Sequence, residues 1–191
     1  RSSRSAPASR SRRSRTSDPP LVRDATPEDA LAIASVRAET WKAAYAHVLS
    51  GEALAALTAE SALDWWTRAI RDPFPHMHTV VAEVDRDVAG FASLGAARDD
   101  DVSGLGELFA IYVLPDAWGR GVGRALMTET LARLRSEGFP EAILWVLEDN
   151  PRARRFYELS GWRADRGVKD EEWLGAMLRE VAFTQMARFD P

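Results

Sequence analysis

A glycine-rich segment in the second half of the chain carries the residues best suited to bind a charged ligand. It reads Gly-Arg-Gly-Val-Gly over residues 119–123 and precedes a stretch, 124–134, whose apolar residues recur at helical spacing. Three of its positions lack a Cβ atom, so the backbone can approach a ligand closely. The free N–H groups of a helix N-terminus attract anions, and Arg120 and Arg124 add positive charge. The segment is predicted to bind a phosphate or pyrophosphate; the alternative is a tight connection in which glycine serves only the turn.

Two common nucleotide-binding motifs do not fit this segment. The dinucleotide fingerprint is G-x-G-x-x-G, whereas the glycines here are spaced G-x-G-x-G, and no acidic residue ends a second strand about 20 residues later. A P-loop requires Gly-Lys-Ser or Gly-Lys-Thr, which does not follow.

The elements that must position the segment are a strand before it and a strand after its helix. Residues 107–114 are apolar on both alternating faces and are followed by Pro115, which indicates a central strand covered on both sides. Residues 142–147 are a short, fully apolar run typical of a buried parallel strand. We therefore expect a right-handed strand–helix–strand crossover over 107–147, with the ligand where the strands end and the helix begins.

The rest of the chain predicts further strands and helices around this unit. Thr26-Pro27 is a helix start, and Asn150-Pro151 is another, because each pairs an N-cap residue with proline at the first helical position. The expected helices cover 26–47, 52–70 and 151–159, and the expected strands cover 21–25, a hairpin over 79–95 that turns at 85–87, 162–168 and 177–188.

The sequence Trp118-Gly-Arg-Gly-Val-Gly-Arg-Ala-Leu126, after Ile111-Tyr-Val-Leu-Pro115, resembles the acetyl-CoA signature of the GNAT N-acetyltransferase superfamily. In that family a Gln/Arg-x-x-Gly-x-Gly/Ala motif holds the CoA pyrophosphate through backbone amides. Gly121 and Gly123 match the motif, whereas Trp118 stands at the Gln/Arg position. By this resemblance, the residues that bind acetyl-CoA are Tyr112, Val113, Trp118, Gly119, Arg120, Gly121, Val122, Gly123, Arg124, Ala125, Asn150 and Tyr157.

The resemblance also implies roles in catalysis. Tyr157 matches a tyrosine near the CoA sulfur, and a phenol of pKa about 10 can protonate a departing thiolate. The backbone N–H groups of Tyr112 and Val113 match those that polarise the thioester carbonyl. A proton acceptor is also needed, because an amine attacks only when neutral. Glu107 is the first candidate, and Glu148 and Asp149 are alternatives.

Aromatic residues of the first two predicted helices are candidates for the acceptor site. In proteins of the GNAT superfamily these helices form one wall of the acceptor pocket, so the resemblance assigns Trp41 and Tyr45 to substrate binding, with Trp65 and Trp66 as further candidates. The alternative is that aromatic residues at helical spacing belong to the hydrophobic core.

Composition narrows the class of protein. Residues 1–19 hold six arginines and one aspartate, which gives a net charge of +5, whereas the remainder holds 19 basic and 28 acidic residues, which gives −9. The Arg/Ser-rich tail, 1–19, is expected to be disordered, and no nucleic-acid partner is expected. Cysteine is absent, which excludes disulfides and thiolate chemistry and favours a cytoplasmic location. No apolar run reaches the ~18 residues of a membrane span, so no membrane partner is expected.

The sequence thus predicts one α/β domain over residues 20–191, with a mixed, mostly antiparallel sheet of about six or seven strands and about four flanking helices. The function implied by the resemblance is direct transfer of an acetyl group from acetyl-CoA, without a metal, to a primary amine of a small molecule or peptide. The alternative is a non-catalytic domain that binds or senses acyl-CoA. A homodimer is left open.

Overall fold

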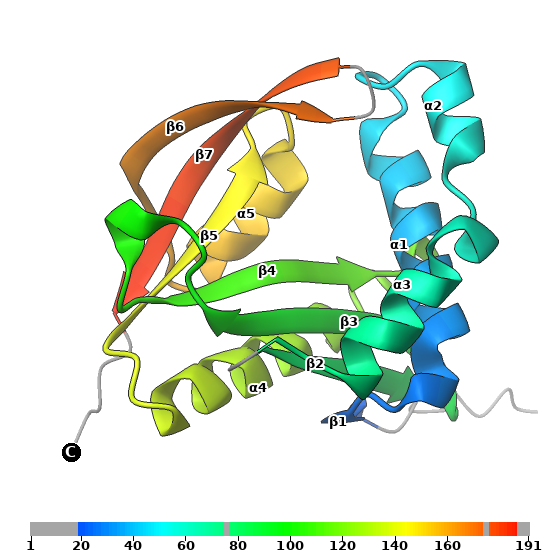
Figure 1. Ribbon diagram of the computed structural model, residues 1–191, viewed down its shortest axis with the longest axis horizontal. Helices are drawn as coiled ribbons and strands as arrows, with labels where there is room; N and C mark the ends of the chain where they lie inside the picture. Colours follow the sequence, from blue (N-terminus) through cyan, green and yellow to red (C-terminus); the bar gives the residue numbers. More distant parts are fainter. Residues whose placement is uncertain (1–18, 75–76, 174–175, 187–191) are drawn as a thin grey trace, which may run out of the picture.

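The computed structural model describes residues 19–74, 77–173 and 176–186. Seven strands in this part of the chain form one sheet in the order β1-β2-β3-β4-β5-β7-β6 (Figure 1). Every neighbouring pair is antiparallel except β4 and β5, so the predicted mixed, mostly antiparallel sheet is confirmed. The strands are β1 (Leu21–Asp24), β2 (His78–Val84), β3 (Asp87–Ala96), β4 (Gly106–Val113), β5 (Glu141–Leu147), β6 (Arg163–Trp173) and β7 (Ala176–Met186).

Five α-helices are described: α1 (Ala30–Tyr45), α2 (Gly51–Ala56), α3 (Ala59–Arg71), α4 (Val122–Ser136) and α5 (Pro151–Leu159). Short 3-10 turns cover Pro27–Asp29, Asp100–Val102 and Pro115–Ala117. The predicted tail lies outside the described residues except for Pro19. None of the described helices is long and apolar enough to cross a membrane.

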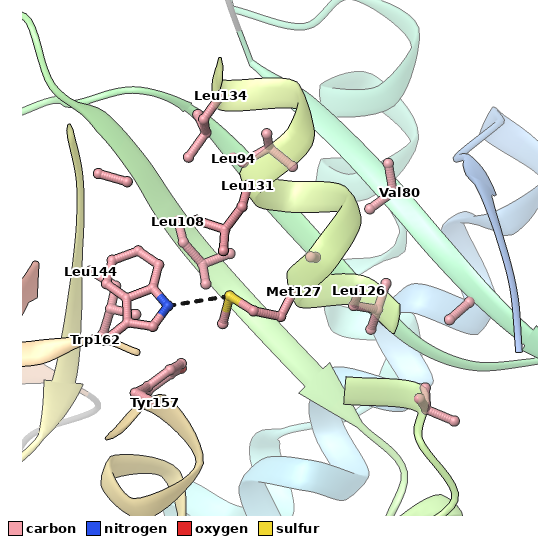
Figure 2. Packing of buried hydrophobic residues seen from close by; sticks show 14 of the residues in the cluster. Val80, Leu94, Leu108, Leu126, Met127, Leu131, Leu134, Leu144, Tyr157 and Trp162 are labelled. Carbon is pink, nitrogen blue, oxygen red and sulfur yellow. Dashed lines mark hydrogen bonds between the residues drawn. The ribbon is translucent and has the colours of Figure 1, made fainter. Parts of the chain in front are cut away.

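Helices cover the two faces of the sheet separately (Figure 1). Leu126, Met127 and Leu134 of α4 pack on one face, in a cluster that also contains Tyr157 of α5 (Figure 2). On the other face, Ile33 of α1 packs with Phe91 of β3 in a second cluster. This two-sided cover explains the nearly continuous apolar run of β3 and β5, because a central strand must bury side chains on both faces.

The prediction of one helix over 52–70 is wrong. The chain instead forms α2 and α3, because Leu57 leaves helical conformation with ψ 86° and Thr58 caps a new helix by accepting the N–H of Ser61 at 3.2 Å. The first helix also differs: Thr26 and Pro27 begin a 3-10 turn, and α1 ends at Tyr45 rather than near residue 47. β6 continues five residues beyond the predicted end at 168, up to Trp173.

The parallel pair β4–β5 is joined over two residue pairs only. Gly106 pairs with Ala142 and Glu107 pairs with Ile143, after which the strands separate (Figure 1). A bulge in β4 opposite Ser93 and Leu94 lies just beyond this junction, and bulges bend a strand. β5 meanwhile pairs with β7 along its whole length. We call the lengths that do not pair with each other, 108–113 of β4 and 144–147 of β5, the diverging segments.

A substitution at Gly90 tests how closely β3 packs against β4. A Cβ atom at this position would lie 2.7 Å from the backbone oxygen of Tyr112, so Gly90→Ala must move the backbone of a central strand. We expect a loss of about 1–3 kcal/mol in the free energy of unfolding, measured by urea denaturation. Gly51→Ala is the control, because no atom lies within 4 Å of its added Cβ. Equal stabilities of the two variants would contradict the packing argument.

Candidate active site

The glycine-rich loop presents unpaired backbone N–H groups at the start of α4. The first intrahelical bond runs from Ala125 N–H to Gly121 O at 3.0 Å, so Val122, Gly123 and Arg124 precede any helical acceptor. Gly119 and Gly121 have φ values of 77° and 87°, in the left-handed region that favours glycine. The predicted glycine turn at a helix N-terminus is therefore confirmed as a backbone structure. It can hold an anion, as helix N-termini do.

Arginine side chains surround this loop. Arg120 is exposed and lies 3.6 Å from Asp85 in a loose ion pair, and Arg124 is exposed. Arg152 of α5 lies with its guanidinium carbon 3.6 Å from the centre of the Trp118 ring. Sequence reasoning missed Arg152, which lies 34 positions after Trp118 and is brought to the loop only by the packing of α5.

Trp118, which stands where the family has Gln or Arg, makes a structural contact. Its Nε1–H donates to the backbone oxygen of Val113 at 2.8 Å, and Thr40 of α1 donates to the same oxygen at 3.2 Å. These two bonds fix the end of β4 against the loop. Trp118 thus holds the connection between strand and helix, while its ring face is occupied by Arg152.

The backbone of β4 directs N–H groups toward β5 where the two strands no longer pair. Leu114 N–H donates to Ala89 O at 2.9 Å, on the β3 side. Alternation along an antiparallel ladder then directs Tyr112 N–H toward β3, and the N–H groups of Ile111 and Val113 toward β5. Of the two predicted polarising amides, this geometry favours Val113. It adds Ile111, which the sequence prediction did not include.

Asn150 joins α5 to α1. Its Oδ1 accepts the N–H of Ala153 at 3.0 Å, which confirms the predicted N-cap before Pro151. Its Nδ2 donates to the Tyr45 hydroxyl at 3.3 Å. Tyr45 and Trp41 are both buried, with ring centres 5.0 Å apart.

The three tyrosines of the chain gather at the diverging segments. Tyr157 is buried against Trp162 and Phe183 in the cluster of Figure 2. Burial raises the pKa of its phenol above the usual value of about 10, and Tyr112 and Tyr45 add to this increase. Burial likewise raises the pKa values of the Tyr45 and Tyr112 hydroxyls. All three phenols therefore keep their protons at neutral pH.

Glu107 lies at the closed end of the β4–β5 pair rather than beside the glycine loop. Only 2% of the residue is exposed, and Arg98 donates three hydrogen bonds to its carboxylate, from N at 3.1 Å, Nε at 3.4 Å and Nη2 at 2.7 Å. The alternative carboxylates follow β5. The Asp149 carboxylate lies 3.3 Å from His47 Nε2, and the backbone N–H of Glu148 donates to the backbone oxygen of Arg179.

The predicted acceptor residues divide into two groups. Trp41 and Tyr45 pack with Leu147 of β5 and border the diverging segments from the α1 face. Trp66 instead packs on Phe91 at 4.9 Å in the core, and Trp65 is 49% exposed on α3. Within the described residues, no group of three or more His, Cys, Asp or Glu side chains could hold a metal ion.

Comparison with known proteins identifies the family. The model of the acetyltransferase (GNAT) family matches residues 36–162, and the chain belongs to this family. The chain is 33% identical over 162 residues to the uncharacterized N-acetyltransferase YuaI of Bacillus subtilis, which covers 84% of this chain and 89% of that protein. The fold class and the acetyltransferase assignment expected from the sequence are thus confirmed.

Two further similarities are more limited. The mycothiol acetyltransferase of Geodermatophilus obscurus is 40% identical over 75 residues, which are 39% of this chain and 24% of that protein. The crystal structure of PaiA N-acetyltransferase from Thermoplasma acidophilum in complex with coenzyme A has a TM-score of 0.63 at 22% identity, covering 87% of this chain and 98% of that one. The second likeness shows the shared fold.

Asn150 offers a test of the junction between α5 and α1. Asn150→Ala removes the cap and should lower the free energy of unfolding by about 1 kcal/mol in urea denaturation. Asn150→Asp keeps an oxygen for Ala153 N–H but loses the donor to Tyr45, so it should retain most of the parent stability. If both variants lose the same stability, the bond to Tyr45 rather than the cap is the stabilising contact.

Proposed function

We propose that this protein transfers an acetyl group from acetyl-CoA to a primary amine by direct attack in a ternary complex. The observation that carries the proposal is the separation of β4 and β5 beside the glycine loop, which brings free backbone N–H groups and three tyrosines to one place. Direct transfer fits the absence of cysteine, because no thiol can carry the acyl group. An intracellular location is part of this proposal.

The loop residues fit a pyrophosphate. The N–H groups of Val122, Gly123 and Arg124 are unpaired within the helix, and a positive charge on Arg120 and Arg124 would complement the ligand. Arg152 would add a third cation beside the loop. The coenzyme A complex of the PaiA enzyme supports the same ligand for this chain.

The diverging segments supply the groups for acyl transfer. When bound, acetyl-CoA supplies a thioester whose C–S bond breaks as the C–N bond forms. The N–H groups of Ile111 and Val113 are oriented to stabilise negative charge on the thioester oxygen. Glu107 is the proton acceptor predicted from the sequence, although both of its oxygens are hydrogen-bonded by Arg98.

Tyr157 is the proposed proton donor to the departing sulfur. Its raised pKa keeps the phenol protonated at neutral pH, so a proton is available for the thiolate. Trp41 and Tyr45 would form part of the acceptor pocket on the opposite side of the diverging segments. The name N-acetyltransferase carried by YuaI supports an amine as the acceptor.

The substitution Gly121→Ala tests whether the glycine-rich loop binds the pyrophosphate, and Gly138→Ala at the other end of α4 is the matched control. Gly121 and Gly138 have φ values of 87° and 88°, and no atom lies within 4 Å of a Cβ added at either. Each change to alanine should therefore cost a similar ~1–2 kcal/mol of stability. Only Gly121→Ala should weaken acetyl-CoA binding, by about tenfold or more in titration calorimetry. Equal affinities of the two variants for acetyl-CoA would argue against a pyrophosphate site at the glycine-rich loop.

Tyr157→Phe tests the proton donor. Release of free thiol from acetyl-CoA is measured over a panel of primary amines, and kcat should fall by about 10²-fold because the leaving group loses its acid. The dissociation constant of acetyl-CoA should stay unchanged. If the parent binds acetyl-CoA but releases no thiol with any amine, the non-catalytic acyl-CoA-binding function is supported instead.

A further inference from the structure

Glu180 of β7 faces the diverging segments from the α1 side of the sheet. It pairs with Leu147, the last residue of β5. Leu147 packs with Trp41 and Tyr45, and so does Leu178, which is two residues from Glu180 and hence on the same face of β7. A carboxylate thus adjoins the apolar cluster that borders the predicted acceptor pocket.

The Glu180 carboxylate has room to accept a proton. Its side chain is 17% exposed, and the cation nearest to it among the described residues is Lys169 Nζ at 3.8 Å. That ammonium is shared, since it also lies 3.7 Å from Asp99 and 3.8 Å from Glu171. No described group donates a hydrogen bond to the Glu180 carboxylate, whereas Arg98 N–H groups occupy both carboxylate oxygens of Glu107.

The surroundings of Glu180 adjust its basicity. Burial raises the pKa of its carboxyl above the usual range, and the charges of Glu171 and Glu107 raise it further, while Lys169 and Arg98 oppose the increase. Its negative charge in turn contributes to the raised pKa values of the Tyr45 and Tyr112 hydroxyls. The charged or titratable groups that face it are Tyr45 from α1, Arg98 and Asp99 after β3, Glu107 and Tyr112 from β4, and Lys169 and Glu171 from β6.

The same face of the sheet carries a cavity beyond Trp145. A cavity of about 350 Å³ is lined by Ile143 and Trp145 of β5, which share a face with Leu147, together with Asp101, Val102, Asp165 and Arg166. Lys169 Nζ lies 4.3 Å from the centre of the Trp145 ring and so links the cavity wall to Glu180. This cavity lies toward the closed end of the β4–β5 pair, where Ile143 pairs with Glu107, and Glu180 does not line it.

We propose that Glu180 is the proton acceptor for the attacking amine, and that Glu107 orients Arg98. The inference rests on the proposed acetyl transfer. The ammonium form of the acceptor gives one proton to Glu180, and the neutral nitrogen attacks the thioester carbonyl. The C–N bond forms and the C–S bond breaks, the second nitrogen-bound proton ends on the sulfur through Tyr157, and Glu180 returns its proton to water.

The test compares Glu180→Gln, Glu180→Asp and the control Glu171→Gln, which removes one neighbouring carboxylate that shares Lys169. Thiol release is followed between pH 5.5 and 9 with an amine that the parent acetylates. Glu180→Gln should lower kcat by 10- to 100-fold and abolish the acidic limb of the profile, because activity is lost as pH falls through the pKa of an essential base. Glu180→Asp should restore part of the activity and the limb. Glu171→Gln should keep the limb but move it toward lower pH, because one charge that raises the pKa of Glu180 is removed.

The melting temperature distinguishes a proton acceptor at Glu180 from a stabilising ion-pair partner of Lys169. A carboxyl whose pKa is raised in the folded state destabilises the protein once pH rises above that pKa, so Glu180→Gln should increase the melting temperature at pH 8. A stabilising salt bridge with Lys169 would predict a decrease. Unchanged kcat and an intact acidic limb in Glu180→Gln would overturn the proposal while leaving acetyl transfer established. Failure of the parent to acetylate any amine would instead overturn the proposed function, and the role of Glu180 with it.

Discussion

The site depends on one feature of the sheet, the separation of β4 from β5 after two residue pairs. Two neighbouring central strands would normally satisfy each other's backbone groups. Here β5 keeps its place because it pairs with β7 over seven positions, and β4 keeps its place through β3. The N–H groups on one edge of β4 are therefore left available at a junction inside the sheet.

The two ends of β4 are held by different contacts, and each fixes part of the site. At the closed end, Glu107 is buried and holds Arg98 with three hydrogen bonds. At the open end, Trp118 and Thr40 donate to the carbonyl of Val113 and attach the glycine loop and α1 to the strand. A buried carboxylate needs such donors because removing a charge from water is costly unless it is hydrogen-bonded. The strand is thus rigid at both ends and unpaired along one edge between them.

The polar groups near the diverging segments are buried more than polar groups usually are. Burial raises the pKa values of Tyr45, Tyr112 and Tyr157, and also that of Glu180. Such burial disfavours the charged forms, so it keeps the three phenols protonated at neutral pH and makes the Glu180 carboxylate a stronger base. Active sites often concentrate perturbed groups in this way, which agrees with the proposed place of acetyl transfer.

The sequence by itself determined the local elements. Glycines at 119, 121 and 123, the Asn150-Pro151 cap and the apolar runs of β4 and β5 depend on backbone conformation and periodicity, which neighbouring residues dictate. Only the tertiary structure decided which side chains meet. Arg152 reaches Trp118, Asn150 reaches Tyr45, and Glu180 faces the diverging segments because strands remote in sequence become neighbours in the sheet order β4-β5-β7. Likewise, Trp65 and Trp66 are adjacent in sequence, yet one is exposed and the other is core, because a helix turns by about 100° per residue and only packing selects the buried face.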